Sequence, residues 1–180
     1  MTASPIILPF KGITPKIHET AFIAPGAAVT GDTEIGEGSN IWFNVSIRGD
    51  VNYVRIGKDT NIQDNSVCHV SYKTHPLIIG DRVTVGHMAV LHGCTIEDDA
   101  FVGMGAIVMD GAVVESGGYV AAGALVTPGK RVKSGEVWAG SPAKFMRPMN
   151  QAEKDYLPWS AKHYRALGEA YKEAETASPC

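Results

Sequence analysis

The chain has 180 residues, enough for one domain that can bury a core without disulfides. Its formal net charge of −3 and the scattered positions of its Lys and Arg residues give no electrostatic reason to expect a nucleic-acid partner. An odd count of cysteines (Cys68, Cys94 and Cys180), no signal-peptide pattern and no apolar run near ~18 residues predict a cytoplasmic protein with free thiols and no membrane partner.

Residues 1–148 repeat with a period of six. Aliphatic residues recur at this spacing at Ile17, Ile23, Val29, Ile35, Ile41 and Ile47, and again at Ile96, Val102, Val108, Val114, Val120, Val126 and Val132. Residues suited to a tight corner stand three positions later, namely Gly26, Asp32, Gly38, Asn44 and Asp50, then Gly105, Gly111, Gly117, Gly123, Gly129 and Gly135. A period of six fits neither an amphipathic helix nor an ordinary meander. It predicts an all-β fold, a parallel β-helix in which three hexapeptides make each coil of a triangular prism.

The period is interrupted three times. Ile47 and Ile56 are nine positions apart, and Cys68 and Ile79 are eleven apart, so we expect loops near residues 48–55 and 70–78. The spacing from Leu91 to Ile96 is five, one residue short of the period.

Residues 149–180 have a helical pattern. Asn150 followed by Glu153 is typical of a capping box, and Pro158 predicts a break or a fresh start of the helix. Tyr164, Leu167 and Tyr171 form an apolar stripe at helical spacing. We expect the helix to lie along one prism face and to add to a contact between subunits, and its final residues to be frayed.

Three histidines stand at related places on the predicted prism. Counting the coils puts His69 and His92 in one outward row, since their separation equals one coil of three hexapeptides plus the loop insertion that follows Cys68. Backbones of adjacent coils are ~4.8 Å apart, close enough for two imidazoles to converge on one ion. His87 lies on the preceding face, across a corner. A three-fold assembly would bring this edge to the His69/His92 edge of the next subunit. The residues therefore predict a metal site shared between subunits, in preference to three unrelated surface histidines.

The stretches "IRGDVNYVRIGKDTNIQDNSVCHV" and "HPLIIGDRVTVGHMAVLHGCTI" together resemble the gamma-class carbonic anhydrases. The resemblance covers residues 10–148 and extends into the C-terminal helix. It implies a left-handed parallel β-helix that forms a homotrimer and binds Zn2+, or in some members Fe2+ or Co2+. The metal ligands would be His69 and His92 from one subunit and His87 from its neighbour.

The same resemblance assigns further residues to the site. Gln63 matches a residue near the metal-bound solvent, and Asn61 matches a residue that lines the same pocket. Tyr164 matches an aromatic residue that approaches the metal in some relatives, so these three are candidate catalytic residues. Arg48, Asp50 and Asp64 match an ionic network at the subunit boundary, for which we favour a structural role.

The predicted function is the reversible hydration of CO2 to bicarbonate. Three neutral imidazoles leave a metal ion at least one open position and can lower the pKa of bound water to about 7, and the resulting hydroxide attacks CO2. The family's best-studied branch has glutamates near the site, one proposed as a proton shuttle, whereas this chain has Val51 and a loop without carboxylates. His75 in that loop could move protons instead, or could be an exposed histidine without a role.

Three alternatives stay open at this point. A hexapeptide acyltransferase would bind an acyl-coenzyme A between prisms and use one histidine as general base, which leaves the geometry of the three histidines unused. A relative that hydrolyses acyl-coenzyme A thioesters would use the same metal site. A third alternative is a metal-binding trimeric scaffold without catalysis, for which the missing glutamates are the main support.

Overall fold

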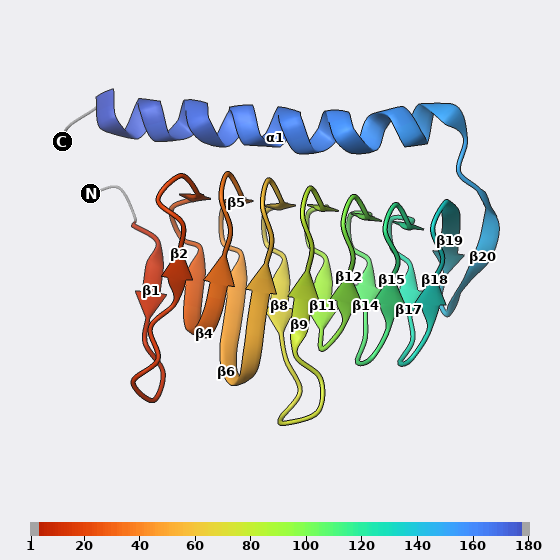
Figure 1. Ribbon diagram of the computed structural model, residues 1–180, viewed down its shortest axis with the longest axis horizontal. Helices are drawn as coiled ribbons and strands as arrows, with labels where there is room; N and C mark the ends of the chain where they lie inside the picture. Colours follow the sequence, from red (N-terminus) through yellow and green to blue (C-terminus); the bar gives the residue numbers. More distant parts are fainter. Residues whose placement is uncertain (1–3, 178–180) are drawn as a thin grey trace.

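The computed structural model describes residues 4–177, which form a stack of parallel β-coils with one long helix alongside (Figure 1). The strands form three faces. The first face consists of β1 (Ile6–Leu8), the first parts of β4 (Ala28–Ile35) and β6 (Ser46–Ile56), β8 (Val67–His69), β11 (Val90–His92), β14 (Ile107–Val108) and β17 (Leu125–Val126). The second consists of β2 (Lys16–Ile17), the second parts of β4 and β6, β9 (Leu77–Ile79), β12 (Thr95–Ile96), β15 (Val113–Val114) and β18 (Arg131–Val132).

The third face consists of β3 (Phe22–Ile23), β5 (Asn40–Ile41), β7 (Asn61–Ile62), β10 (Thr84–Val85), β13 (Phe101–Val102), β16 (Tyr119–Val120) and β19 (Glu136–Gly140). The last strand, β20 (Ala143–Pro148), pairs antiparallel with β19 at the end of the stack. Val102 pairs with Val120 and Val114 with Val132, so one coil takes three hexapeptides. The predicted fold class, a parallel β-helix built from hexapeptide repeats with a C-terminal helix, is confirmed.

The repeated aliphatic residues fill the prism. Ile41, Ile62, Val85 and Val102 stack on one face, and each is fully buried. A β-branched side chain suits this position because it packs well on a pleated surface whose inner side is dry.

At most corners, the residue three positions after the buried aliphatic residue has a positive φ. Examples are Asn44 after Ile41 and Gly105 after Val102. Asp32 and Asp50 do not take this role, because β4 and β6 bend round their corner as continuous strands. Gly31 is the residue with positive φ there, and a Cβ on it would lie 2.2 Å from the carbonyl oxygen of Gly49.

The three-residue insertion expected near 48–55 lies within β6 rather than in an open loop. Gly31 pairs with Gly49 and Thr33 pairs with Val54, so β6 advances five residues while β4 advances two. The chain stays extended because both strands continue round the corner together. The second insertion is a true loop, between the end of β8 at His69 and the start of β9 at Leu77.

The helix α1 (Gln151–Ala177) runs back along the stack, against β3, β5, β7 and β10 of the third face (Figure 1). Its capping box is confirmed, since the Glu153 N–H donates to Asn150 Oδ1 and the Asn150 N–H donates to Glu153 Oε2, both at 2.9 Å. The predicted stripe is also confirmed on the prism face, where Tyr171 lies 5.4 Å from Trp42 between ring centroids.

The expected break at Pro158 is wrong, because α1 continues through this residue. Pro158 lies on the exposed side of the helix, while Leu157, Ser160 and Ala161 are buried beside it. This packing on both sides of the proline holds the helix together despite the lost backbone donor. The final residues, which we expected to be frayed, include Cys180. Residues 178–180 lie outside the described part of the chain.

Among residues 4–177, no helix has the length and apolar character needed to cross a bilayer.

Candidate metal centre

His69 and His92 lie side by side on adjacent coils. Each is the last residue of its strand, β8 and β11, and the two pair in register. The side chains point outward from the first face, since Cys68 and Leu91 before them are fully buried. His69 Nδ1 lies 3.0 Å from His92 Nε2. The predicted row of two histidines is therefore present within one chain.

In each of the two rings, the nitrogen that faces away from the other histidine is hydrogen-bonded to a carboxylate. His69 Nε2 lies 3.1 Å from Asp50 Oδ1, and His92 Nδ1 lies 2.6 Å from Asp110 Oδ1. Burial raises the pKa of Asp50, but hydrogen bonds from Arg48 and His69 outweigh it and hold that pKa below its usual value. The pKa of Asp110 is likewise lowered, because hydrogen bonds from Ser71 and His92 outweigh burial. Both carboxylates are thus ionised near neutral pH and can only accept hydrogen bonds.

These hydrogen bonds fix where the ring protons lie. His69 must donate from Nε2 and His92 from Nδ1, which leaves His69 Nδ1 and His92 Nε2 as bare nitrogens in the neutral rings. Burial lowers the pKa of His69 and so disfavours an extra proton on its ring. When both rings are neutral, two lone pairs face each other across 3.0 Å, an arrangement that a cation between them would stabilise.

The spacing also fits a metal ion. Two nitrogens bound to a tetrahedral ion at about 2.0–2.1 Å are roughly 3.3 Å apart, near the observed distance. A ligating histidine almost always donates its other N–H to a carboxylate or carbonyl, as both do here. The residues present fit a divalent cation with imidazole ligands.

His87 has the same local arrangement at another corner. It lies between β10 and β11, and its Nδ1 lies 2.8 Å from Asp64 Oδ2. Its side chain is 40% exposed. Within residues 4–177 of one chain, no three His, Cys, Asp or Glu side chains gather as a metal site. The structure thus brings His69 and His92 together, and leaves His87 on the other edge of the first face.

Gln63 and Asn61 lie on the His87 side. Gln63 is 5% exposed and donates from Nε2 to Asn61 Oδ1 at 3.0 Å. Asn61 is fully buried and donates in turn to Thr84 Oγ1, which is hydrogen-bonded to Ser160 of α1. Asn61 thus lies beneath Gln63 and holds it, and a part for Asn61 in the catalytic site stays a prediction.

Tyr164 approaches the same edge from α1. Its ring lies 5.8 Å from that of Trp42, between centroids. Burial raises the pKa of Tyr164, and the charge of Asp64 raises it further, so the phenol keeps its proton. Tyr164 therefore lies near the carboxylate that holds His87.

Arg48 forms an ion pair with Asp50, the carboxylate that holds His69. His75 lies in the loop between β8 and β9, close to the corner that follows His92: a Cβ built on Gly93 would lie 2.8 Å from the His75 Cβ. His75 is thus folded back towards the candidate site.

Asp110 is the residue that the sequence analysis missed. It stands at the corner after β14, one coil beyond His92, and its second oxygen accepts the Ser71 hydroxyl at 2.6 Å. The signal available in the sequence is its separation from His92, which is one full coil of three hexapeptides.

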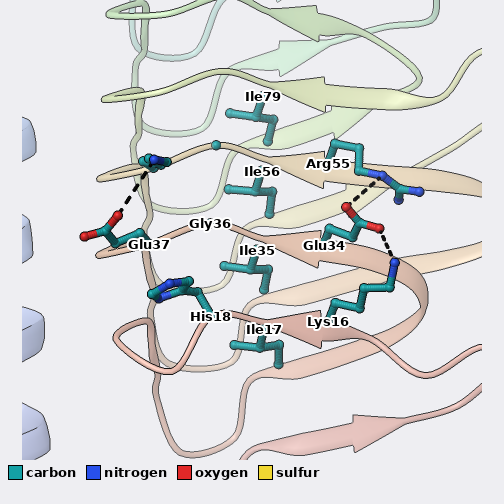
Figure 2. A pocket seen from close by; sticks show the side chains of 12 residues that line it. Lys16, Ile17, His18, Glu34, Ile35, Gly36, Glu37, Arg55, Ile56 and Ile79 are labelled. Atoms are coloured by element: carbon teal, nitrogen blue, oxygen red, sulfur yellow. Dashed lines mark hydrogen bonds and ion pairs between the residues drawn. The ribbon is translucent and has the colours of Figure 1, made fainter.

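A hollow of about 590 Å³ on the second face lies apart from these histidines (Figure 2). Its basic side chains are already paired, Lys16 with Glu34 at 2.9 Å and Lys58 with Glu37 at 3.8 Å. Figure 2 shows the Lys16, Glu34 and Arg55 row beside the stacked isoleucines. None of the candidate residues lines this hollow, so it is not part of the site.

The chain resembles known proteins in sequence and in structure. Residues 14–49 match the family model described as "Bacterial transferase hexapeptide (six repeats)". The chain is 47% identical over 167 residues to a carbonic anhydrase of Geobacillus kaustophilus, covering 93% of this chain and 91% of that protein. It is 54% identical over 170 residues to the mitochondrial gamma carbonic anhydrase 1 of Arabidopsis thaliana, covering 92% of this chain but only 62% of the plant protein.

A solved structure with a different description has the same fold. The hexapeptide transferase family protein from Anaplasma phagocytophilum superimposes with a TM-score of 0.89 at 49% identity, covering 92% of this chain and 98% of that chain.

Proposed function

The chain belongs to the gamma carbonic anhydrase family, and we propose that it catalyses the reversible hydration of CO2 to bicarbonate. The observation that carries this proposal is the close approach of His69 Nδ1 and His92 Nε2, which lie 3.0 Å apart with a carboxylate at the other nitrogen of each ring. Such a pair has little use in an acyl transfer, whereas it supplies two ligands of a hydrolytic metal site.

The third ligand in this proposal is His87 of a neighbouring subunit. The first face carries an apolar surface between its two edges, with Val67, Ile107 and Met109 exposed. Met88 and Met104 continue this surface at the His87 corner and are 63% and 56% exposed. The second face is lined by ion pairs and the third is covered by α1. We propose that the first face is buried in a homotrimer, which brings His87 to the His69/His92 pair of the next chain.

The proposed ion is Zn2+, with Fe2+ or Co2+ suited to the same imidazole donors. When bound, it supplies Lewis acidity that makes water acidic enough to provide hydroxide near pH 7. Asp50, Asp64 and Asp110 keep the three rings in the tautomers that expose their ligating nitrogens.

Gln63 would orient substrate or product. Its side chain has a donor group and an acceptor group, and Asn61 fixes its position from below. Tyr164, with its proton retained, could donate a hydrogen bond at the same edge. Arg48 neutralises Asp50 and would stiffen the subunit boundary.

Stopped-flow measurement of CO2 hydration tests the proposal, on protein loaded with zinc and, under anaerobic conditions, with iron. We expect one metal ion per subunit and a hydration rate that depends on it. Protein that binds the metal but hydrates no CO2 with either ion would contradict the proposed activity, and parallel assays of acyl-coenzyme A hydrolysis would then test the same site for thioester chemistry.

A further inference from the structure

We propose that Asp110 is a positioning residue for the metal site, which sets the tautomer and direction of His92 and ties that ring to the loop between β8 and β9. This inference rests on the proposed function and adds a residue to its site. Asp110 contacts neither substrate nor metal in this proposal. It acts through His92.

The geometry joins three successive coils at one carboxylate. Asp110 lies at the corner after β14, and it reaches back to His92 at the end of β11. Its other oxygen accepts the Ser71 hydroxyl, two residues after the end of β8. The two hydrogen bonds are both 2.6 Å long, and they occupy different oxygens of the carboxylate. The ring and the loop are therefore held by the same carboxyl group.

Gly93 leaves the space that this arrangement requires. A Cβ on Gly93 would lie 2.4 Å from Asp110 Oδ1, the atom that holds His92, and 2.8 Å from the Cβ of His75. The φ angle of Gly93 is 55°, so a side chain would be disfavoured there for the backbone as well. The corner after His92 is thus shaped to let a carboxylate from the next coil pass behind the ring.

The loop is fastened at a second point. The side-chain amide of Asn52 donates to the Ser71 carbonyl oxygen at 3.1 Å, and the Ser71 N–H donates to the His75 carbonyl oxygen at 2.9 Å. Ser71 is therefore the anchor through which Asp110 acts on the loop. Loss of the carboxylate would free both the ring of His92 and the anchor of the loop.

The test compares Asp110→Ala, Asp110→Asn and Ser71→Ala with Asp98→Ala as a matched control. Asp98 also stands at a corner, and its carboxylate accepts a hydrogen bond from the Asp81 N–H of the previous coil at 2.9 Å. This bond involves no histidine. Two readouts are used: the affinity for Co2+ followed by its visible absorption, and the histidine tautomers of metal-free protein in two-bond ¹H–¹⁵N spectra.

We expect D110A to weaken Co2+ binding by about 10–100-fold, in line with the usual effect of removing the carboxylate behind a ligating histidine. Its His92 should lose the single tautomer protonated at Nδ1. D110N should fall between D110A and wild type, because its amide oxygen can still accept the ring N–H. S71A should change the affinity by less than about threefold, since the bond to His92 remains. D98A should match wild type.

Wild-type affinity and an unchanged His92 tautomer in D110A would overturn the proposal. D110N is isosteric, so the same result in D110N would overturn it even if D110A fails to fold. Failure of the proposed function is a separate outcome: metal-loaded wild type that hydrates no CO2 leaves the metal-free histidine spectrum, and hence the role of Asp110, intact.

Discussion

His69 Nδ1 lies 3.0 Å from His92 Nε2, although the two residues are 23 positions apart in the chain. The coil repeat explains the proximity, since β8 and β11 pair in register and the extra residues between them are taken up by the loop after His69. Their carboxylate partners come from β6 and from the corner after β14, so the pair is held from the coil on either side.

Substitution His92→Ala should remove the metal and keep the prism. The side chain points away from the aliphatic core, so its loss leaves the stacked coils intact, whereas two ligands rarely hold a structural ion. We expect metal content to fall from about one ion per subunit to below about a tenth of that value, with an unchanged far-ultraviolet circular dichroism spectrum. His163→Ala, which alters a helix histidine stacked on Trp159, serves as the control. Full metal occupancy in H92A would make the ligand assignment wrong.

Substitution Gln63→Ala should reduce catalysis without loss of metal. Gln63 lies beside Asp64 but is hydrogen-bonded to Asn61 rather than to a histidine. Because the amide is proposed to orient the reacting groups, kcat/KM for CO2 hydration should fall on the order of 10²-fold. Gln151→Ala changes an exposed amide and should have no effect. If Q63A kept wild-type kcat/KM, Gln63 would have no role in the reaction.

Substitution His75→Ala should affect proton removal only. A histidine folded back towards the site can accept a proton there and pass it to solvent. We expect CO2 hydration in dilute buffer to slow by about tenfold, and concentrated imidazole buffer to restore it. The control is His18→Ala, since His18 is hydrogen-bonded to Thr20 on the second face. Identical buffer dependence in H75A and wild type would exclude His75 from the mechanism.

The start of α1 should confer a pH-dependent part of the stability. Hydrogen bonds from the Arg147 guanidinium and, to a smaller extent, from the Asn150 N–H together lower the pKa of Glu153 from 4.5 to about 2. Because the folded-state pKa is depressed, the ionised carboxylate stabilises the protein above pH 4.5, and this contribution is lost as the pH falls towards 2.

We therefore expect Glu153→Gln to unfold at lower urea concentration than wild type at pH 6, and the difference in free energy of unfolding to shrink between pH 5 and pH 2. Gln keeps the capping geometry, so the comparison isolates the charge. A difference that does not vary with pH would contradict the role of the Arg147–Glu153 pair.

The six-residue period was sufficient to predict the coils, because Ile, Val and Gly each occupy a position with one steric requirement, repeated many times. It also placed His69 and His92 in one row, since register follows from counting. The bend of β4 and β6 could not be predicted in this way, because strand continuity there depends on the close backbone approach of Gly31 and Gly49.

Side-chain partners were predicted less well than positions. Asp50 and Asp64 entered through family resemblance, whereas Asp110 was missed because its side chain reaches back across a corner from the next coil. The contacts of Asn61 could not be predicted for a related reason: α1, far away in sequence, covers it through Ser160 and Thr84. Continuity of α1 at Pro158 likewise depends on tertiary packing, which local propensity does not contain.

The most direct test of the shared site mixes two defective variants, His87→Ala and His92→Ala, by unfolding and refolding them together at equal concentration. Each variant alone should bind no metal. In a mixed trimer a site is intact when the His69/His92 pair comes from H87A and His87 comes from H92A, so about a quarter of the sites should recover metal and CO2 hydration. No recovery in mixtures shown by mass measurement to contain both chains would contradict a site built between subunits.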